Sequence, residues 1–550
     1  MPLGWFARDS EIADPFTFAA VWRAYLACRR GKRHSSSAQR YEMNGLERIM
    51  DTANALQSRC YTPARALSFI AKTPKAREIH AADFSDRVVH HLLVPYLERL
   101  YEPVLIHDVY SNRKGKGIHA AVARLQTFQR RVSHNGQRPA YQLQLDIANF
   151  FNRIDRRRLF GLIDRRLSRA VFRDRVLAPN AADDLRWLTR RLLTGNPALS
   201  AYCMATPAEL AQVPPHKRLI NAPPEKGLPI GNLTSQFFAN VYLNELDQFI
   251  KHQLKCRFYL RYVDDFMLLH ESAEQLVAWR DAIQAFLVER LTLTLKDPHV
   301  TPQPISQGAN FLGYIVRPHY RLVRRRVVAN LHQRLRLFAA QAIQAGCLQL
   351  FPASREQLRA TLASYLGHFR HAHSYRLRQA LWRRYPWLGL LFRCAPDGCL
   401  KPLWEPPRVS SLRSQWRYFK QTYPSAWVLL QVGNRIECYD DDVNRCLQYY
   451  PYWRYLRGAS LKTRPGFQQS ASWPLCWRHG LLKQLSADRC PFIYVAEEGY
   501  LRGGLKRRTL RIVAGALVPT LERSSLYTSP VIPAGKRVSS AREGKANTSL

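Results

Sequence analysis

Apolar residues follow two different periods along this chain. Over residues 84–105, 232–250 and 327–384 they recur roughly every three to four positions, which predicts helices. Residues 141–151, YQLQLDIANFF, form an apolar stretch that runs into a turn, as is typical of a strand. Residues 256–270, CRFYLRYVDDFMLLH, have two apolar halves around an acidic turn and predict two strands. Helices and strands in this mixture favour an α+β fold.

Composition divides the chain further. Its 550 residues suffice for about three or four domains. Proline and turn formers gather in CAPDGCLKPLWEPPRVS, which predicts a linker at 401–410. The linker would separate basic helices at 331–400 from a small α/β domain at 411–518. Residues 519–550 are polar and weakly hydrophobic, so we expect a disordered tail.

The charge balance is strongly basic. Lysine and arginine number 83 against 41 acids, which gives a formal net charge of +42. Such an excess favours a polyanionic partner, because neutralising phosphates releases counterions. Nucleic acid is the first candidate, and an anionic membrane surface is the competitor. No apolar run approaches the roughly 20 residues of a membrane span, so we expect no membrane insertion. The eleven cysteines are irregularly spaced, which indicates reduced thiols and a cytoplasmic protein.

Three carboxylates stand out against their apolar surroundings. Asp264 and Asp265 interrupt an apolar stretch, and Asp146 ends the apolar run of residues 143–145. Unpaired buried carboxylates are unfavourable, whereas carboxylates at the tip of a hairpin can hold divalent cations. Nucleotide addition requires two such cations about 4 Å apart. Taken singly, the acidic pair could be an ordinary turn and Asp146 a helix cap.

The order of the motifs resembles that of reverse transcriptases. LQLDIANFF resembles their motif A, GLPIGNLTSQFFANVYLNELD at 227–247 their motif B, and RYVDDFMLLH their motif C. GANFLGY at 308–314 resembles the primer grip, and PKAREI at 74–79 the fingers strand that contacts the incoming nucleotide. The resemblance implies a right-hand polymerase, with fingers and a palm with an antiparallel sheet over 1–330 and a helical thumb over 331–400.

The resemblance also implies roles for the acids. Asp146 and Asp264 would bind two Mg²⁺ ions, which Mn²⁺ could replace, and Asp265 would be the supporting acid of the catalytic set. The backbone at Ile147 would take part in the metal and triphosphate site. Template RNA, a cDNA or primer strand and dNTPs would be the substrates.

Further positions would bind the nucleotide. Phe151 matches the steric gate, a ring that excludes a ribose 2′-hydroxyl. The remaining expected nucleotide contacts are Arg77, Lys75, Ile230, Gly231 and Gln236. Lys296 and His299 both lie near the place of the family's proton-donating lysine, so the sequence leaves that role open.

One subgroup is especially similar. IGNLTSQFFAN, FSDRVVHHLL, YSNRKGKGIHAA and SYLGHFRHAHSY resemble reverse transcriptases of diversity-generating retroelements, found in bacteria and phages. The resemblance implies error-prone copying of a template-repeat RNA opposite adenine (mutagenic retrohoming), with a basic pentameric accessory variability determinant protein as partner. Ile230 replaces a common glutamine, and an apolar residue there would reduce discrimination that rests on polar contacts. The alternatives are a retron or antiphage-defence reverse transcriptase and a non-catalytic nucleic-acid-binding scaffold.

The C-terminal segment resembles another family. Residues 416–446 and 493–513 resemble the N-terminal mismatch-recognition domain of MutS proteins. Arg435 and Glu437 occupy the positions of its Phe-x-Glu element, and arginine is a poor apolar wedge. We therefore expect nucleic-acid holding rather than mismatch sensing. The run Arg324, Arg325 and Arg326 is expected to follow phosphates.

Overall fold

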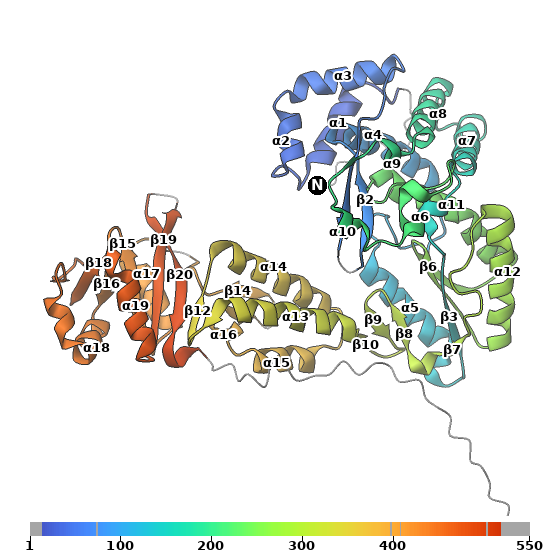
Figure 1. The fold of residues 1–550 in the computed structure, drawn as a ribbon. Helices are drawn as coiled ribbons and strands as arrows, with labels where there is room; N and C mark the ends of the chain where they lie inside the picture. Colours follow the sequence, from blue (N-terminus) through green and yellow to red (C-terminus); the bar gives the residue numbers. More distant parts are fainter. Residues whose placement is uncertain (1–13, 73–74, 396–398, 408, 502–503, 519–550) are drawn as a thin grey trace, which may run out of the picture. The chain divides into compact units, whose positions relative to one another are not determined.

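The protein consists of two compact units, Met1–Leu322 and Val323–Leu550 (Figure 1). The computed structural model describes residues 14–72, 75–395, 399–407, 409–501 and 504–518. Both units contain helices and strands, which confirms a mixed α+β fold. The predicted disordered tail at 519–550 lies outside the described residues.

Twelve α-helices lie in the described part of the first unit. The most buried is α11, in which twelve of sixteen residues are buried, so it is enclosed on nearly every face rather than along one stripe. The helices are α1 (Phe18–Arg29), α2 (Ser36–Glu42), α3 (Gly45–Gln57), α4 (Phe84–Tyr101), α5 (Ile118–Val132), α6 (Phe150–Arg153), α7 (Arg156–Phe172), α8 (Pro179–Thr194), α9 (Pro197–Ser200), α10 (Pro207–Leu210), α11 (Leu233–Gln248) and α12 (Ala273–Leu291).

An antiparallel four-stranded sheet in the order β5-β6-β3-β7 forms the centre of this unit. Its strands are β3 (Tyr141–Asp146), β5 (Phe258–Tyr262), β6 (Asp265–His270) and β7 (Gln303–Pro304). A second sheet has the order β2-β1-β4, with β1 (Leu67–Ala71), β2 (Arg77–Ala81) and β4 (Tyr202–Cys203).

The segment that resembles the primer grip lies on two short strands. Leu312 and Gly313 have φ angles of 48° and 91° and form a turn between β8 (Ala309–Phe311) and β9 (Tyr314–Val316). The third strand of this small sheet is β10 (Arg321–Val323). The FLGY sequence is therefore a hairpin, because glycine readily adopts the left-handed conformation that the turn requires.

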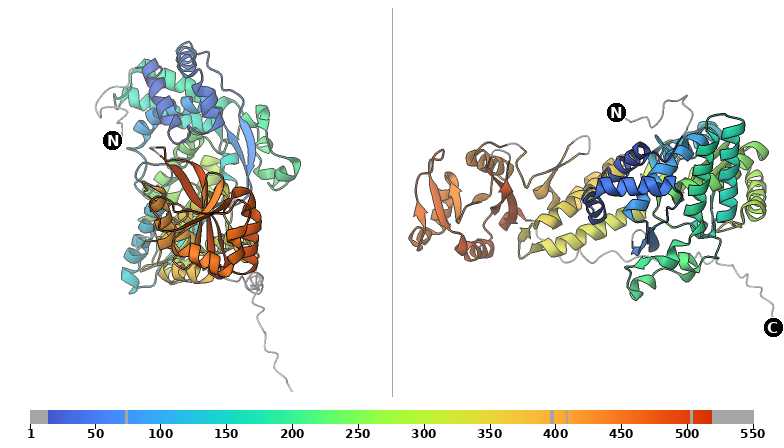
Figure 2. Two further views of the ribbon diagram at one scale, coloured as in Figure 1. Left: turned by 90° about the vertical axis from the view of Figure 1, so that its left-hand side faces the viewer. Right: turned by 90° about the horizontal axis from the view of Figure 1, so that it is seen from above.

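The second unit is built on a mixed eight-stranded sheet in the order β11-β12-β20-β19-β15-β16-β18-β17. Its strands fan out in the left view of Figure 2, as expected for a twisted sheet. They are β11 (Ile343–Gln344), β12 (Cys347–Gln349), β15 (Trp427–Val432), β16 (Arg435–Tyr439), β17 (Ser460–Leu461), β18 (Ser470–Pro474), β19 (Phe492–Tyr500) and β20 (Lys506–Ala514). The helices are α13 (Arg325–Ala342), α14 (Pro352–Phe369), α15 (Tyr375–Arg384), α16 (Leu388–Leu391), α17 (Leu412–Thr422), α18 (Asp441–Tyr449) and α19 (Arg478–Ala487).

The segment predicted as a linker, 401–410, contains the end of a strand and a buried tryptophan. Strands β13 (Phe392–Cys394) and β14 (Leu400–Pro402) form a hairpin that leads into Trp404. Trp404 is fully buried, packs edge-on against Phe392, and accepts a backbone hydrogen bond from Leu510 at 2.8 Å. The helices at 331–400 and the C-terminal sheet therefore share one hydrophobic core. Across the described segments, no helix is both long and apolar enough to traverse a bilayer.

Candidate active site

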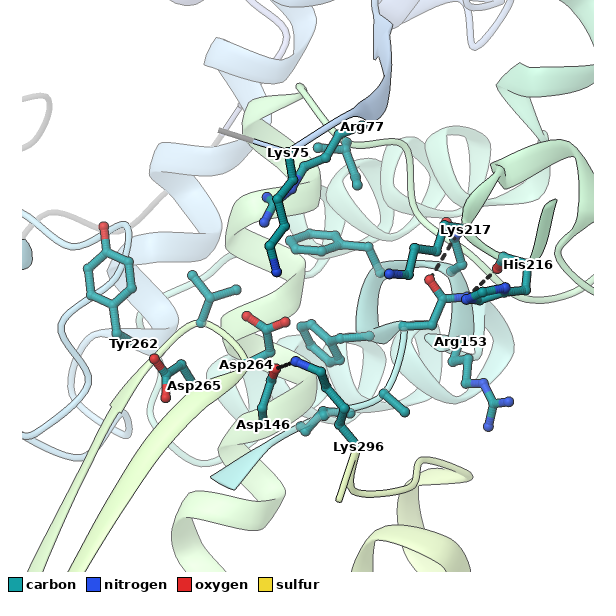
Figure 3. A pocket seen from close by; sticks show the side chains of 18 of the residues that line it. Lys75, Arg77, Asp146, Arg153, His216, Lys217, Tyr262, Asp264, Asp265 and Lys296 are labelled. Atoms are coloured by element: carbon teal, nitrogen blue, oxygen red, sulfur yellow. Dashed lines mark hydrogen bonds and ion pairs between the residues drawn. The ribbon is translucent and has the colours of Figure 1, made fainter. Parts of the chain in front are cut away.

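An open cleft of about 1620 Å³ lies in the first unit. The four-stranded sheet, the strand β2, the loop before α11 and the start of α11 all contribute to its walls. Figure 3 shows acids on one side and the basic Lys75 and Arg77 on the other. The cleft contains every predicted catalytic, metal and nucleotide position: Lys75, Arg77, Asp146, Ile147, Phe151, Ile230, Gly231, Gln236, Asp264 and Asp265.

The acids converge because three backbone segments meet at one end of the sheet. Asp146 ends β3 and lies directly opposite Asp265, the first residue of β6. Asp264 occupies the two-residue turn between β5 and β6, where Val263 has a φ of 57°. The carboxylates of Asp146 and Asp264 point toward each other, whereas Asp265 turns to the other side (Figure 3). Asp265 accepts a hydrogen bond of 2.9 Å from Gln144.

Burial and mutual repulsion raise the pKa values of Asp264 and Asp265. Burial raises the pKa of Asp265 to about 7, with added repulsion from Asp146 and Asp264. Burial and the charge of Asp146 likewise raise the pKa of Asp264. Hard carboxylate oxygens brought together in this way suit Mg²⁺, because a cation offsets the repulsion that the fold imposes.

A lysine lies at the same point. The Nζ atom of Lys296 is 2.5 Å from Oδ2 of Asp146, and this hydrogen bond raises the pKa of Lys296. The amide of Lys296 donates to the carbonyl of Asp146, and the amide of Ala148 donates to that of Thr294. Neither of these two backbone hydrogen bonds involves the carbonyl oxygen of Ile147. Of the two proton-donor candidates, Lys296 lines the cleft and His299 is not among its lining residues.

The wall opposite the acids joins the strand β2 to the loop before α11. The amide of His80 donates to the carbonyl of Ile230 at 2.9 Å, and the side chain of Asn232 accepts from the amide of Ala82. Gly231 has a φ of 118°, and a Cβ there would lie 2.9 Å from a methyl group of Ile79. Only glycine permits this close approach.

Phe151 lies on the floor of the cleft in the short helix α6. A left-handed Asn149 (φ 47°) turns the chain sharply after β3 and leads into this helix. The ring of Phe151 is half-buried against Phe150. The backbone carbonyl of Phe151 accepts a hydrogen bond from the amide of Leu228 at 2.8 Å. The loop before α11 thus also fixes the position of the predicted steric gate.

A buried ion pair next to the acidic turn was missed by sequence reasoning. Arg261 and Asp247 are both completely buried and form bonds of 2.8 and 2.6 Å. Arg261 also donates to the carbonyl of Val263 at 3.0 Å and to the side chain of Asn240 at 3.2 Å. Burial alone would lower the pKa of Arg261, but Asp247 raises it above its usual range. An arginine within the apolar strand RFYLRY was the available signal, because it requires a buried partner.

The backbone amide of Val263 in the same turn also takes part in hydrogen bonds. The hydroxyl of Ser111 accepts from the amide of Val263 at 3.0 Å and donates to the side chain of Asn240. Asn240 in turn donates to the carbonyl of Ser111 at 2.8 Å. Val263 is β-branched and unfavourable at positive φ, so these contacts compensate for a strained backbone.

The predicted nucleic-acid residues of the second unit are arranged differently. The carboxylate of Glu437 is buried and bound by Arg464 at 2.5 and 2.6 Å and by the hydroxyl of Tyr439. Arg435 donates to Ser472 and to the carbonyl of Gly458. The oxygens of Glu437 are thus engaged within the domain, and its contact with nucleic acid stays a prediction. The three predicted phosphate contacts, Arg324, Arg325 and Arg326, lie at the start of α13. Arg325 and Arg326 are exposed.

Comparisons with known proteins match the central part of the chain. Residues 70–316 match a family model described as "Reverse transcriptase (RNA-dependent DNA polymerase)". The Group II intron-encoded protein LtrA of Lactococcus lactis subsp. cremoris is 22% identical over 343 residues, covering 49% of this chain and 50% of its own. The chain therefore spans about half the length of the curated relatives it matches.

Solved telomerases are also similar in part. Apo telomerase from Candida tropicalis, truncated from its C-terminal domain, matches with a TM-score of 0.35 and 11% identity, over 49% of this chain and 59% of its own. Telomerase from Candida tropicalis in complex with a fragment of telomeric RNA matches with a TM-score of 0.35 and 12% identity, over 62% and 59%.

Proposed function

We propose that this chain, whose residues 70–316 form a reverse transcriptase domain, is an RNA-directed DNA polymerase with Asp146, Asp264 and Asp265 at its active site. The observation that carries the proposal is the meeting of these acids in an open cleft opposite Arg77. In this assignment the four-stranded sheet is the palm, β1 and β2 belong to the fingers, and α13 to α15 form the thumb.

Asp146 and Asp264 would hold two Mg²⁺ ions, with Asp265 supporting them and the carbonyl of Ile147 available nearby. When bound, the ions would activate the primer 3′-hydroxyl and stabilise the charge on the triphosphate. The fold prepares the site by keeping the two carboxylates close despite their repulsion. Lys296, whose ammonium group lies beside Asp146, would donate a proton to the departing pyrophosphate.

The opposite wall would select and orient the dNTP. The guanidinium of Arg77 suits the triphosphate, because it forms directed charge-assisted hydrogen bonds with phosphate oxygens. Lys75 adds a second positive charge on the same side (Figure 3). Phe151 would exclude the 2′-hydroxyl, and Ile230, Gly231 and Gln236 would border the base pair being formed.

We further propose that the enzyme makes adenine-mutagenic cDNA from a template-repeat RNA of a diversity-generating retroelement. Support comes from the IGNLTSQFFAN motif and from Ile230, which lines the cleft with a side chain that offers no hydrogen bond. A basic accessory protein would assist the reaction. The C-terminal domain, similar in sequence to a MutS domain, would hold nucleic acid.

The test is primer extension on an adenine-containing RNA template with Mg²⁺, with Asp264→Asn as the matched control. cDNA that depends on Asp264 and carries errors concentrated opposite adenine supports both proposals. Accurate cDNA supports the polymerase and favours a retron or antiphage-defence enzyme. No cDNA, even with the native RNA and the accessory protein, would leave a nucleic-acid-binding scaffold.

A further inference from the structure

One stretch of the second unit lacks acidic residues. Residues 444–487 contain seven lysines and arginines and no aspartate or glutamate, whereas the whole chain carries an acid about every 13 residues. The stretch includes the end of α18, the following 3₁₀ turn Pro451–Tyr455, strands β17 and β18, and all of α19. A stretch that carries cations and no acid favours contact with a polyanion over contact with a basic partner.

Large aromatic rings are exposed on the same stretch. Tyr449, Tyr452 and Tyr455 are 67%, 47% and 80% exposed, and Trp477 is 41% exposed. We call these four rings, with the exposed cations of the stretch, the aromatic–basic surface; the cations are Arg445, Arg454, Arg457, Lys462, Arg478 and Lys483. Isolated exposed rings are common, but rings interleaved with arginines have the composition of single-strand binding sites.

The rings are presented on a firm support. Between the exposed tyrosines, Tyr450 and Trp453 are buried and stack with ring centroids 4.4 Å apart. The indole of Trp473 donates to the carbonyl of Trp453. Gln484 of α19 donates to the hydroxyl of Tyr452 at 2.7 Å, which holds the turn Pro451–Tyr455, called the tyrosine turn below, beside α19. Binding to such a surface requires little ordering of side chains.

Arg435, a predicted nucleic-acid contact, also supports this surface. Arg435 donates to the carbonyl of Gly458 at 2.7 Å and thereby fixes the loop that follows Tyr455. With Glu437 bound by Arg464, the exposed recognition chemistry of this part of the domain lies on the tyrosine turn rather than on β16.

We propose that the aromatic–basic surface binds single-stranded nucleic acid, with bases stacked on Tyr449, Tyr452 and Tyr455 and phosphates contacted by the neighbouring arginines. Stacking of this kind requires unpaired bases, because every base in a duplex already has neighbours on both faces. The site lies in the second unit, so binding there does not depend on the polymerase reaction.

The test uses the full-length chain in EDTA, so that no extension occurs. A single-stranded RNA of about 12 nucleotides carrying 4-thiouridine is photocrosslinked, and the crosslinked peptides are mapped by mass spectrometry. We expect crosslinks in the peptides of residues 446–478. The variant Tyr449→Leu/Tyr452→Leu/Tyr455→Leu should lose them by at least about ten-fold. The corresponding triple phenylalanine variant should retain them, and Tyr500→Leu, which removes an exposed ring of β19, is the matched control.

The readout at these peptides is independent of the cleft, so it separates this proposal from the polymerase assignment. Crosslinks confined to the first unit would overturn the proposal, whatever the polymerase activity. Equal competition by double-stranded DNA of the same length would also overturn it, because paired bases cannot stack on the rings. An unchanged crosslink yield in the triple leucine variant, with an unchanged thermal unfolding curve, would assign the surface another role, such as protein contact.

Discussion

The pair formed by Arg261 and Asp247 is the clearest place to separate folding from catalytic positioning. Arg261 is both half of a buried ion pair and a hydrogen-bond donor to the carbonyl of Val263, the residue before Asp264. We consider Arg261→Met, which keeps much of the side-chain volume and removes every donor. We compare it with the double variant Arg261→Met/Asp247→Leu, in which no charge remains at the pair.

The structure gives the size of the two effects. Arg261→Met leaves the carboxylate of Asp247 buried with the hydroxyl of Tyr259 as its remaining side-chain donor among those described. Removing one partner of a buried pair costs about 3–5 kcal/mol. The unit Met1–Leu322 has an unfolding entropy of roughly 2.1 cal/mol/K per residue, so its Tm should fall by about 4–7 °C. Replacing both partners by apolar residues is often close to neutral, so the double variant should recover most of this loss.

In the double variant we expect the polymerase activity to stay low although the Tm recovers. The carbonyl of Val263 has no donor from position 261 in either variant, and the strained turn is free to shift. A displacement of about 1 Å at a catalytic group can reduce the rate about 100-fold. We therefore expect both variants to lose rate on that scale and to require more Mg²⁺ for half-maximal extension, because Asp264 no longer faces Asp146 correctly.

Scanning calorimetry measures the Tm, and single-nucleotide extension over a range of Mg²⁺ concentrations measures the rate and the metal requirement. Arg59→Met is the matched control, because Arg59 forms a half-exposed pair with Asp184, and such pairs contribute about 1 kcal/mol or less. Recovery of both Tm and rate in the double variant would refute the reasoning, since the pair would then serve folding alone.

Three further outcomes are expected. Phe151→Ala should lower the preference for dNTPs over rNTPs at least about ten-fold, measured as a ratio of kcat/KM values, because the clash with the 2′-hydroxyl is removed; an unchanged ratio would place the gate elsewhere. Ile230→Gln should lower misincorporation opposite adenine in sequenced cDNA, with Ile230→Leu as control; an unchanged error rate would make Ile230 a packing residue. Burial and neighbouring acids raise the pKa of Asp264 and raise that of Asp265 to about 7, so Mg²⁺ must displace protons. Its affinity should rise with pH up to about 7 and level off above, and calorimetry in buffers of different ionisation enthalpy should show proton release, whereas pH-independent binding would contradict this.

The sequence was sufficient to predict several of the residues that line the cleft. The acids, Phe151 and Arg77 lie in short motifs whose order was informative, and all of them line one cavity. The sequence did not predict how the acidic turn is held. Asp247 is near the end of a helix and Arg261 is on a strand, and nothing in their spacing indicates that they meet. Long-range contacts of this kind depend on packing, which local patterns do not encode.

The segment at 401–410 is a second case in which local sequence patterns do not predict long-range packing. Proline and turn formers predict irregular backbone, and β13, β14 and the following turns are indeed short. Composition does not reveal whether irregular backbone is exposed. Trp404 is buried because Phe392 and the strand β20 supply its surroundings, and β20 begins about 100 residues later in the chain.

The C-terminal domain shows that a motif match predicts which residue occupies a position more reliably than it predicts the surroundings of that residue. At the active site the fold buries the carboxylates of Asp264 and Asp265 and brings them close to Asp146, and burial first, then that proximity, raises the pKa of Asp264 and of Asp265. Glu437 matches a base-contacting position equally well by sequence, yet Arg464, 27 residues later, neutralises it and Tyr439 donates to it. A carboxylate that is buried and paired would have to break about two charge-assisted contacts to reach a base, which is unfavourable by several kcal/mol. The exposed tyrosines of the same domain require no such rearrangement, and for that physical reason they are the better candidates for contact with nucleic acid.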